Sequence, residues 1–257
     1  MTPPPVISGS SSAPPSTATA LQQAVESVEQ AGSALALLEA SRALASVLAT
    51  AAGPGTSPQG AAVPAASEAE VAALEAAISC LVEVLGFNNP GAAVAAVEGL
   101  IALGPAAVEP LLTRLDPRNY GARAWAVRAL AGIGDVRGLE LLEEALAQDV
   151  GPSVRRAAAC GLGQLRLAAL AAAERRQTRA RALAALLAGC ADGEWVVRYA
   201  VAVGLERLVL TMDPCLEERA LALSALNGLG RADQEDTAVV RLRASLAERR
   251  LRERLQG

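Results

Sequence analysis

The chain has 257 residues, of which 52% are hydrophobic and only 2% aromatic, with a formal net charge of −4 and no histidine. The absence of histidine excludes catalytic arrangements that need an imidazole and metal sites built on histidine. The negative net charge argues against nucleic acid as a partner, and we expect neither a metal site nor a resident cofactor.

The first part of the chain is expected to contain one short helical region between two unstructured stretches. Residues 1–19 consist of Pro, Ser, Thr and Ala and predict a disordered tail. Residues 20–50 predict an N-terminal amphipathic helix or helix pair, and residues 51–67, rich in Gly and Pro, a flexible linker.

Location is predicted from three negative observations. The N-terminus lacks the basic and apolar regions of a signal peptide, and no apolar run of 18 residues is free of charge, so we expect no membrane span. The four cysteines have no metal-ligand spacing. These features predict a cytoplasmic protein with reduced thiols.

Residues 68–257 are dominated by a short sequence motif that occurs four times, which we call the phrase. It occupies residues 89–94, 119–125, 150–156 and 193–199, and an Ala-rich run with one leucine follows each copy. A period of this size predicts stacked supersecondary units, here helical hairpins in an all-α solenoid. The leucines, at spacings of 30, 32 and 43 residues, are Leu100, Leu130, Leu162 and Leu205.

The later units carry the helical pattern most clearly. In the third unit the apolar residues Val154, Ala158, Gly161, Leu162 and Leu165 recur at helical spacing. The longest spacing implies an insert at residues 166–178, expected to be an extended helix or a protruding loop. A weak unit at 216–230 precedes a charged helix at 237–256, which we expect to cap the solenoid with a polar outer face.

An arginine column gives the first candidate site. Arg123, Arg155 and Arg198 each lie seven residues before the leucine of their unit. One interpretation is structural, with each guanidinium bonded to an acid or carbonyl of a turn; the candidate acids are Asp116, Asp149 and Asp192. The other is functional, since a guanidinium recognises a ligand carboxylate through two parallel hydrogen bonds.

Four aromatic residues give the second candidate site. Tyr120 and Trp195 occupy one repeat position, while Trp125 and Tyr199 lie near the start of the same helices. They either fill the hairpin tips or form a stacking surface for a planar ligand or a partner. The cysteines, by contrast, are expected to be small core residues.

These residues resemble a known family. Residues 85–94, 119–135, 154–158 and 194–200 are similar to the HEAT-type repeats of the phycobilisome lyase family, and most similar to the F-type (beta) subunits of heterodimeric phycocyanobilin lyases. The resemblance covers roughly residues 21–50 and 75–210 and implies a HEAT-like solenoid. The linker at 51–67 departs from the family as an insertion. The Asn-His-Cys motif of the related isomerising lyases is absent, which argues against bilin isomerisation.

The resemblance implies an enzyme that attaches phycocyanobilin through a thioether to a cysteine of the apo-phycocyanin α subunit, together with an E-type lyase partner. No catalytic residue is assigned, and the bilin is substrate rather than cofactor. The hypothetical bilin-binding residues are Arg123, Arg198, Tyr120, Trp125, Trp195 and Tyr199. The alternatives are a non-catalytic scaffold or chaperone for phycobiliprotein or lyase assembly, and a general adaptor.

Overall fold

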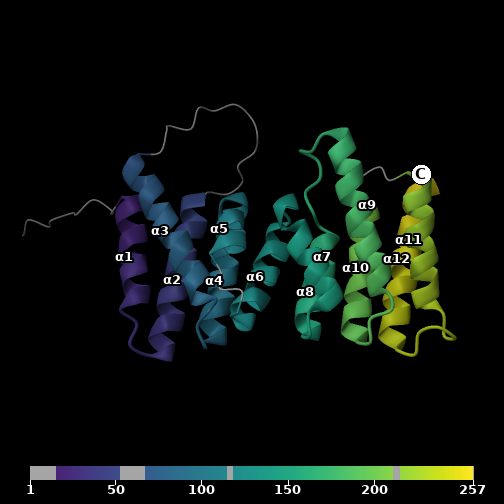
Figure 1. Ribbon diagram of the computed structural model, residues 1–257, viewed down its shortest axis with the longest axis horizontal. Helices are drawn as coiled ribbons and strands as arrows, with labels where there is room; N and C mark the ends of the chain where they lie inside the picture. The colour runs from purple at the N-terminus through teal and green to yellow at the C-terminus, as the bar shows by residue number, and fades with distance from the viewer. Residues whose placement is uncertain (1–15, 53–66, 115–117, 211–214, 257) are drawn as a thin grey trace, which may run out of the picture.

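The computed structural model describes residues 16–52, 67–114, 118–210 and 215–256. Within these ranges the chain forms twelve α-helices, two short 3-10 helices and no strand, which confirms the all-α prediction (Figure 1). The elements are α1 (Thr17–Glu29), α2 (Ala34–Ala52), α3 (Glu68–Val84), α4 (Pro90–Leu103), η1 (Gly104–Ala107), α5 (Val108–Thr113), α6 (Tyr120–Ile133), η2 (Val136–Gly138), α7 (Leu139–Gln148), α8 (Pro152–Leu162), α9 (Ala172–Gly189), α10 (Trp195–Leu210), α11 (Leu216–Gly230) and α12 (Ala238–Gln256).

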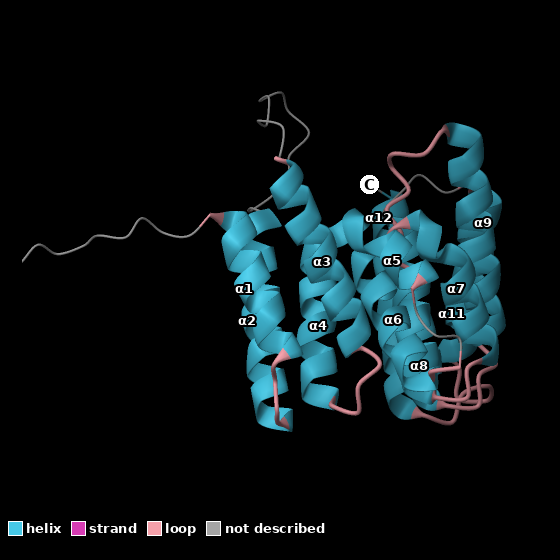
Figure 2. Ribbon diagram, turned by 60° about the vertical axis from the view of Figure 1, so that its left-hand side comes forward, coloured by secondary structure: helices cyan, strands magenta, loops and turns pink. Residues whose placement is uncertain are grey.

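The helices form two layers of a solenoid. Each odd-numbered helix pairs with the even-numbered helix that follows it, and α2, α4, α6, α8, α10 and α12 pack side by side in that order. Apart from the connection between α5 and α6, the turns from odd to even helices lie along the lower edge of the molecule in Figure 1, and Figure 2 shows their loops at the same edge. We call this the turn edge.

The four copies of the phrase form the turns before α4, α6, α8 and α10 and the first turns of these helices. Asn89 and Asn119 cap α4 and α6, where their side-chain oxygens accept hydrogen bonds from the backbone N–H groups of Ala92 (3.1 Å) and Ala122 (3.0 Å). Pro90 and Pro152 occupy the first helical position, where no N–H is needed. The phrase therefore starts a helix, as its composition predicts.

The N-terminal helical region is the first unit of the stack. Helix α1 packs against α3, and α2 packs against α4, so the first hairpin continues both layers. Helix α1 begins at Thr17 behind the cap Ser16, inside the stretch predicted as tail. Helix α2 extends to Ala52, and Ser67 caps α3. The remainder of the predicted tail and linker, residues 1–15 and 53–66, lies outside the described residues.

The core consists of small residues and leucines between the two layers. The four repeat leucines are each fully buried, and all five residues of the helical stripe predicted in the third unit are buried. Helices α8 and α10 approach so closely that a Cβ added to Gly163 would lie 2.4 Å from the Cα of Gly204. Glycine at this crossing is therefore a steric requirement.

The C-terminal region differs in detail from the expectation. Residues of the predicted insert form a loop up to Ala171 and then the first turns of α9, so both expected forms are present. Helix α12 is the even helix of a complete final hairpin with α11, not an appended helix. Its inner side buries Val240, Ala244, Ala247 and Leu251, while its outer side carries arginines together with the exposed Leu242.

Two described stretches are long and apolar enough to resemble membrane spans. One, Ala34–Ala51, is nearly all of α2, and the other, Pro90–Thr113, is broken at Gly104, where φ is 66°. Both are built into the solenoid, since α2 packs on α1 and α4, and α4 packs on α2 and α6. The structure thus gives both stretches a place as packed hairpin helices.

Candidate functional site

The arginine column forms a series of ion pairs along the turn edge, which we call the ladder. In it Arg123, Arg155 and Arg198 each pair with an acid of the following turn. Arg155 of α8 donates through Nε and Nη2 to the two carboxylate oxygens of Asp192, at 2.7 and 3.0 Å. Its Nη1 donates to the carbonyls of Asp149 (2.8 Å) and Val150 (3.2 Å) in its own turn. One guanidinium therefore fixes its own turn and ties it to an acid of the following unit.

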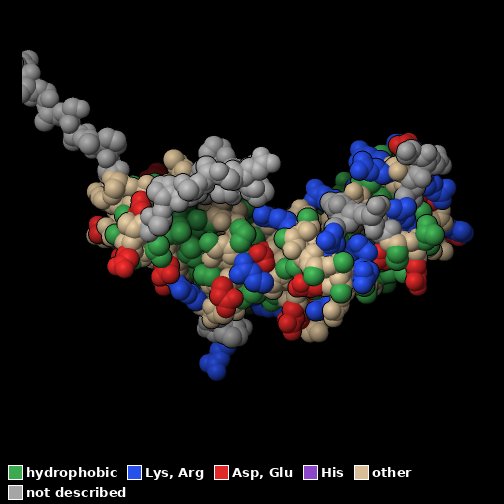
Figure 3. Space-filling model, turned by 90° about the horizontal axis from the view of Figure 1, so that it is seen from above, with side chains coloured by type: hydrophobic (Ala, Val, Ile, Leu, Met, Phe, Trp, Pro, Cys, Tyr) green, Lys and Arg blue, Asp and Glu red, His purple; other side chains and the backbone are tan. Residues whose placement is uncertain are grey.

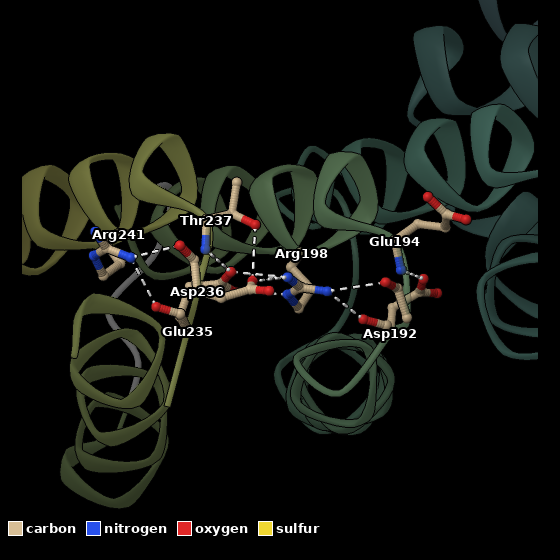
Figure 4. A network of polar contacts seen from close by, with 8 residues as sticks. Asp192, Glu194, Arg198, Glu235, Asp236, Thr237 and Arg241 are labelled. Atoms are coloured by element: carbon tan, nitrogen blue, oxygen red, sulfur yellow. Dashed lines mark hydrogen bonds and ion pairs between the residues drawn. The ribbon is translucent and has the colours of Figure 1, made fainter. Parts of the chain in front are cut away.

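Arg198 repeats this geometry one unit later (Figure 4). Its Nε and Nη2 donate to Glu235 at 2.6 and 2.8 Å, and its Nη1 donates to the carbonyls of Asp192 (2.8 Å) and Gly193 (3.2 Å). Exposed Asp236 adds a contact at 3.4 Å. The acid again belongs to the next turn along the chain.

Arg123 forms the first ion pair of the ladder, but its guanidinium contacts two carboxylates instead of one. Its Nη1 contacts Asp149 and its Nη2 contacts Glu144, both at 3.0 Å. The Asp149 side chain is fully buried, and Gly151 N–H also donates to it at 2.8 Å. Asp149 and Asp192 are thus partners of ladder arginines, whereas Asp116 lies outside the described residues.

The electrostatics of the ladder favour the charged forms. The hydrogen bonds from Arg198 lower the pKa of Glu235 to about 2, against the opposing effect of burial. Burial alone would raise the pKa of Asp192, but hydrogen bonds from Arg155 and from the Glu194 N–H outweigh it, so this pKa is also lowered. Glu235 and Asp192 therefore stay ionised because their arginines are in place.

This geometry bears on the bilin-binding hypothesis for Arg123 and Arg198. Their ladder carboxylates, Asp149 and Glu235, have side chains that are 0% and 1% exposed. A ligand carboxylate could take their place only by leaving a buried acid without its cation, which is costly. Each ladder arginine thus has the acidic partner that a structural role requires. Ligand binding by Arg123 and Arg198 stays a hypothesis.

Arg241 is a further member of the column that the sequence analysis missed. Its Nη1 donates to the carbonyls of Glu235 (2.9 Å) and Asp236 (2.8 Å), as Arg155 and Arg198 do in their own turns. The signal was present, because Val239-Val240-Arg241 repeats Val196-Val197-Arg198. Arg241 was missed because Glu248 stands where the other units have their leucine. Among the described residues, no carboxylate meets the rest of the Arg241 guanidinium.

The four predicted aromatic residues divide into two kinds. Tyr120 and Trp195 are the first residues of α6 and α10 and are each 46% exposed at the turn edge. The Tyr120 hydroxyl donates to Asp149 at 2.5 Å and accepts from Gly151 N–H at 3.1 Å. The bond to Asp149 is the largest cause of the raised pKa of Tyr120. Tyr120 therefore belongs to the ladder, while Trp195 offers an exposed indole.

Trp125 and Tyr199 are partly buried against the core. The Arg128 guanidinium lies 4.8 Å from the centroid of the Trp125 ring, within the range of a cation–π interaction. Tyr199 packs against the C-terminal half of the core. Since α8 lies between α6 and α10, the structure does not bring the four aromatic side chains into one cluster.

The cysteines are free and dispersed. Burial raises the pKa of Cys80 and of Cys190 to about 11, so both are neutral thiols at physiological pH. Cys160 is partly buried and Cys215 exposed. The described residues contain no group of His, Cys, Asp and Glu that could hold a metal ion.

Charge is distributed unevenly between the two edges. Acidic residues gather at the C-terminal turns of the turn edge, where Asp192, Asp233, Glu235 and Asp236 border a cavity of about 450 Å³. On the opposite edge, seen from above in Figure 3, arginine and lysine colouring gathers over the C-terminal half. All 23 basic residues of the chain are arginine, which suits a structure that uses planar, multiply bonded cations.

Comparison with known proteins decides the family. The family described as HEAT repeats matches residues 78–163 and 108–206. The bilin biosynthesis protein RpcF of Synechococcus sp. WH8020 is 52% identical over 176 residues, which is 68% of this chain and 81% of that protein. The chain belongs to the F-type branch of the HEAT-repeat bilin lyase family.

Two further members of the bilin lyase family extend the comparison. The phycocyanobilin lyase subunit beta of Pseudanabaena tenuis is 41% identical over 237 residues, covering 92% of this chain and 75% of that protein. One chain in the structure of the CpcE–CpcF complex of phycocyanin lyase from Nostoc sp. PCC7120 is 42% identical, with a TM-score of 0.61. That match covers 68% of this chain and 99% of the Nostoc chain.

Proposed function

We propose that this chain is the F-type subunit of a bilin lyase that attaches phycocyanobilin to a cysteine of the phycocyanin α subunit through a thioether. The observation that carries the proposal is the 42% identity to one chain of a phycocyanin lyase complex over 99% of that chain. The same complex supports an E-type HEAT-repeat subunit as the partner of this chain.

The chemistry of the reaction fits a chain without catalytic histidine or metal. The acceptor sulfur adds to the ethylidene carbon of the bilin, and the thiol proton is delivered to the adjacent ring carbon, so no bond to the enzyme is needed. The bilin is the electrophile and the acceptor supplies the nucleophile. The enzyme then accelerates the reaction by holding both in a productive orientation.

The role of this chain is binding and orientation, with no resident cofactor. The raised pKa values of Cys80 and Cys190 support a mechanism in which these two thiols do not take the bilin. The free cysteines fit a reducing compartment, and we place the protein in the cytoplasm. Tyr120, Trp125, Trp195 and Tyr199 remain hypothetical bilin contacts.

The test is reconstitution. Purified chain, E-type subunit, phycocyanobilin and apo-phycocyanin α subunit are mixed, and covalent product is detected by zinc-enhanced fluorescence after denaturing electrophoresis. We expect product with both lyase chains and little with this chain alone. A complex that binds the apo-α subunit yet gives no more thioether than the uncatalysed mixture would support a chaperone, a function in keeping with a 48% identical relative from Synechococcus elongatus called phycobilisome maturation protein.

A further inference from the structure

A cavity of about 390 Å³ opens at the turn edge between the second and third hairpins. Val82 of α3 and Ala122 of α6, each 2% exposed, form its apolar floor. The rim carries the polar groups of Glu83, Arg114 and Asn119. An apolar floor with a few polar groups around it is the usual composition of a small-molecule site, and this volume lies in the usual range of about 300–1,000 Å³.

The only phenylalanine of the chain stands at this cavity. Phe87 is 48% exposed and lies in the turn between α3 and α4. In a chain whose core is built from alanine and leucine, this ring is not used to fill the interior. A half-exposed ring beside an apolar floor can stack on a planar conjugated ligand.

Arg114 gives the cavity a cation that meets no carboxylate among the residues the structure describes. Its guanidinium crosses from the end of α5 to hydrogen-bond the hydroxyl of Ser79 on α3. No ion pair of Arg114 occurs among the described residues. The cavity at the other end of the turn edge differs, because its arginine, Arg198, is held by Glu235 and four acids surround it. Of these two cavities, only the one with Arg114 suits a carboxylate ligand.

The backbone at Gly86 keeps the cavity open. A Cβ at this position would lie 3.1 Å from Asn119 Nδ2 and 3.3 Å from the Glu83 carbonyl. Asn119 Nδ2 in turn donates to the Gly86 carbonyl at 3.2 Å, which holds the two turns together. A larger side chain at position 86 would therefore occupy the space between the turns.

We propose that this cavity receives a propionate-bearing pyrrole ring of the bilin, with Phe87 against the ring face and Arg114 on the propionate. The inference rests on the proposed function and assigns its substrate contact. Glu83 stands on the same rim and can accept hydrogen bonds from pyrrole N–H groups, while the ladder arginines remain engaged with their own acids. Arg114, rather than Arg123 or Arg198, is then the propionate ligand contributed by this chain.

The test compares two ligands in the purified complex with the E-type subunit: phycocyanobilin and its dimethyl ester, which lacks carboxylate charge. Binding is measured by absorbance titration for the wild type and for Arg114→Gln, Gly86→Leu and the control Arg231→Gln. Arg231 lies on the same edge, is 54% exposed and pairs with Asp233 within its own turn.

We expect Arg114→Gln to weaken binding of the free acid by about tenfold or more, the loss expected for a charge-assisted hydrogen bond, and to leave binding of the ester unchanged. Gly86→Leu should weaken both ligands, and Arg231→Gln neither. Arg114→Gln affecting both ligands equally, or neither, overturns the inference. If the variants bind as the wild type does while the wild-type complex transfers bilin, only the cavity assignment falls. If the wild-type complex neither binds nor transfers bilin, the proposed function falls as well.

Discussion

Arg155 and Asp192, 37 residues apart in sequence, form a two-pronged ion pair in which both carboxylate oxygens are engaged. The two side chains are 16% and 9% exposed, so water screens them little. The pair joins α8 to the turn before α10, and with the equivalent pairs of Arg123 and Arg198 it ties four consecutive units in register.

Replacing Arg155 with alanine should lower the free energy of unfolding by about 2–4 kcal/mol, because a buried acid loses its cation and two carbonyls lose a donor. Urea unfolding followed by circular dichroism measures the loss. The matched control is Arg181→Ala: this arginine pairs with Glu143 at the surface and is 48% exposed. Its loss should cost less than about 1 kcal/mol. Equal costs for the two variants would contradict a structural ladder.

A paired measurement on Arg198→Ala separates the structural role from bilin binding. We expect the variant to melt well below the wild type, since Glu235 loses both of its ladder bonds. Bilin affinity, measured at a temperature where the variant is folded, should stay close to that of the wild type. Weakened affinity without a change in melting temperature would instead put Arg198 at the propionate.

Glu235 makes the stability of the last two units depend on pH. Its pKa falls from an ordinary 4.5 to about 2 in the folded chain, so its contribution is fully present above the unfolded pKa and is lost as pH falls through the folded value. The difference in unfolding free energy between the wild type and Glu235→Gln should be constant from pH 7 to about 5 and shrink below that. A difference that grows on acidification would refute the assignment.

The glycine contact between α8 and α10 can be tested by a single methyl group. Gly163→Ala should cost about 1–3 kcal/mol, the usual range for overpacking, because the new Cβ would overlap the backbone of Gly204. Gly193→Ala is the control, since nothing lies within 4 Å of a Cβ at that position. The comparison uses thermal unfolding, and a neutral Gly163→Ala would mean that the two helices can separate at little cost.

Thiol reactivity should follow burial. At pH 8 we expect iodoacetamide to modify exposed Cys215 rapidly, and Cys80 and Cys190 only after denaturation, because their pKa values of about 11 leave little thiolate. Mass spectrometry of the peptides gives the order. A folded variant with all four cysteines replaced should still transfer bilin; loss of transfer with retained binding would require a covalent intermediate on the enzyme.

The sequence predicted those parts of the fold that depend on local patterns. The phrase and its leucine gave the register of four even helices, and all four leucines are buried as expected. The final unit was underestimated because a charged residue, Glu248, replaces the leucine. The stacking of the α1–α2 hairpin was not foreseen, because its turn carries Ser33-Ala34 in place of the phrase.

The candidate-site residues that could be predicted are likewise those that follow a local sequence pattern. Asp149 and Asp192 were predicted as partners of the arginine column because acids recur in the turns. Glu235 was not, because it lies in a unit whose repeat pattern had weakened. The cavity beside Phe87 gave no sequence signal at all, since it depends on how Arg114 and Asn119 of one unit face Gly86 of the unit before it. Such spaces arise from the packing of neighbouring turns, which periodicity does not encode.

The ladder gives the solenoid a polarity. Each arginine depends on an acid that comes later in the chain, and Ala93 stands at the arginine position of the second hairpin. Deleting α1 and α2 would therefore break no ion pair of the ladder. Deleting α11 and α12 with their connecting turn would remove Glu235 and leave Arg198 without its buried carboxylate. Within the ladder, loss of the C-terminal hairpin therefore weakens the unit before it, whereas loss of the N-terminal hairpin leaves every ladder arginine with its acid.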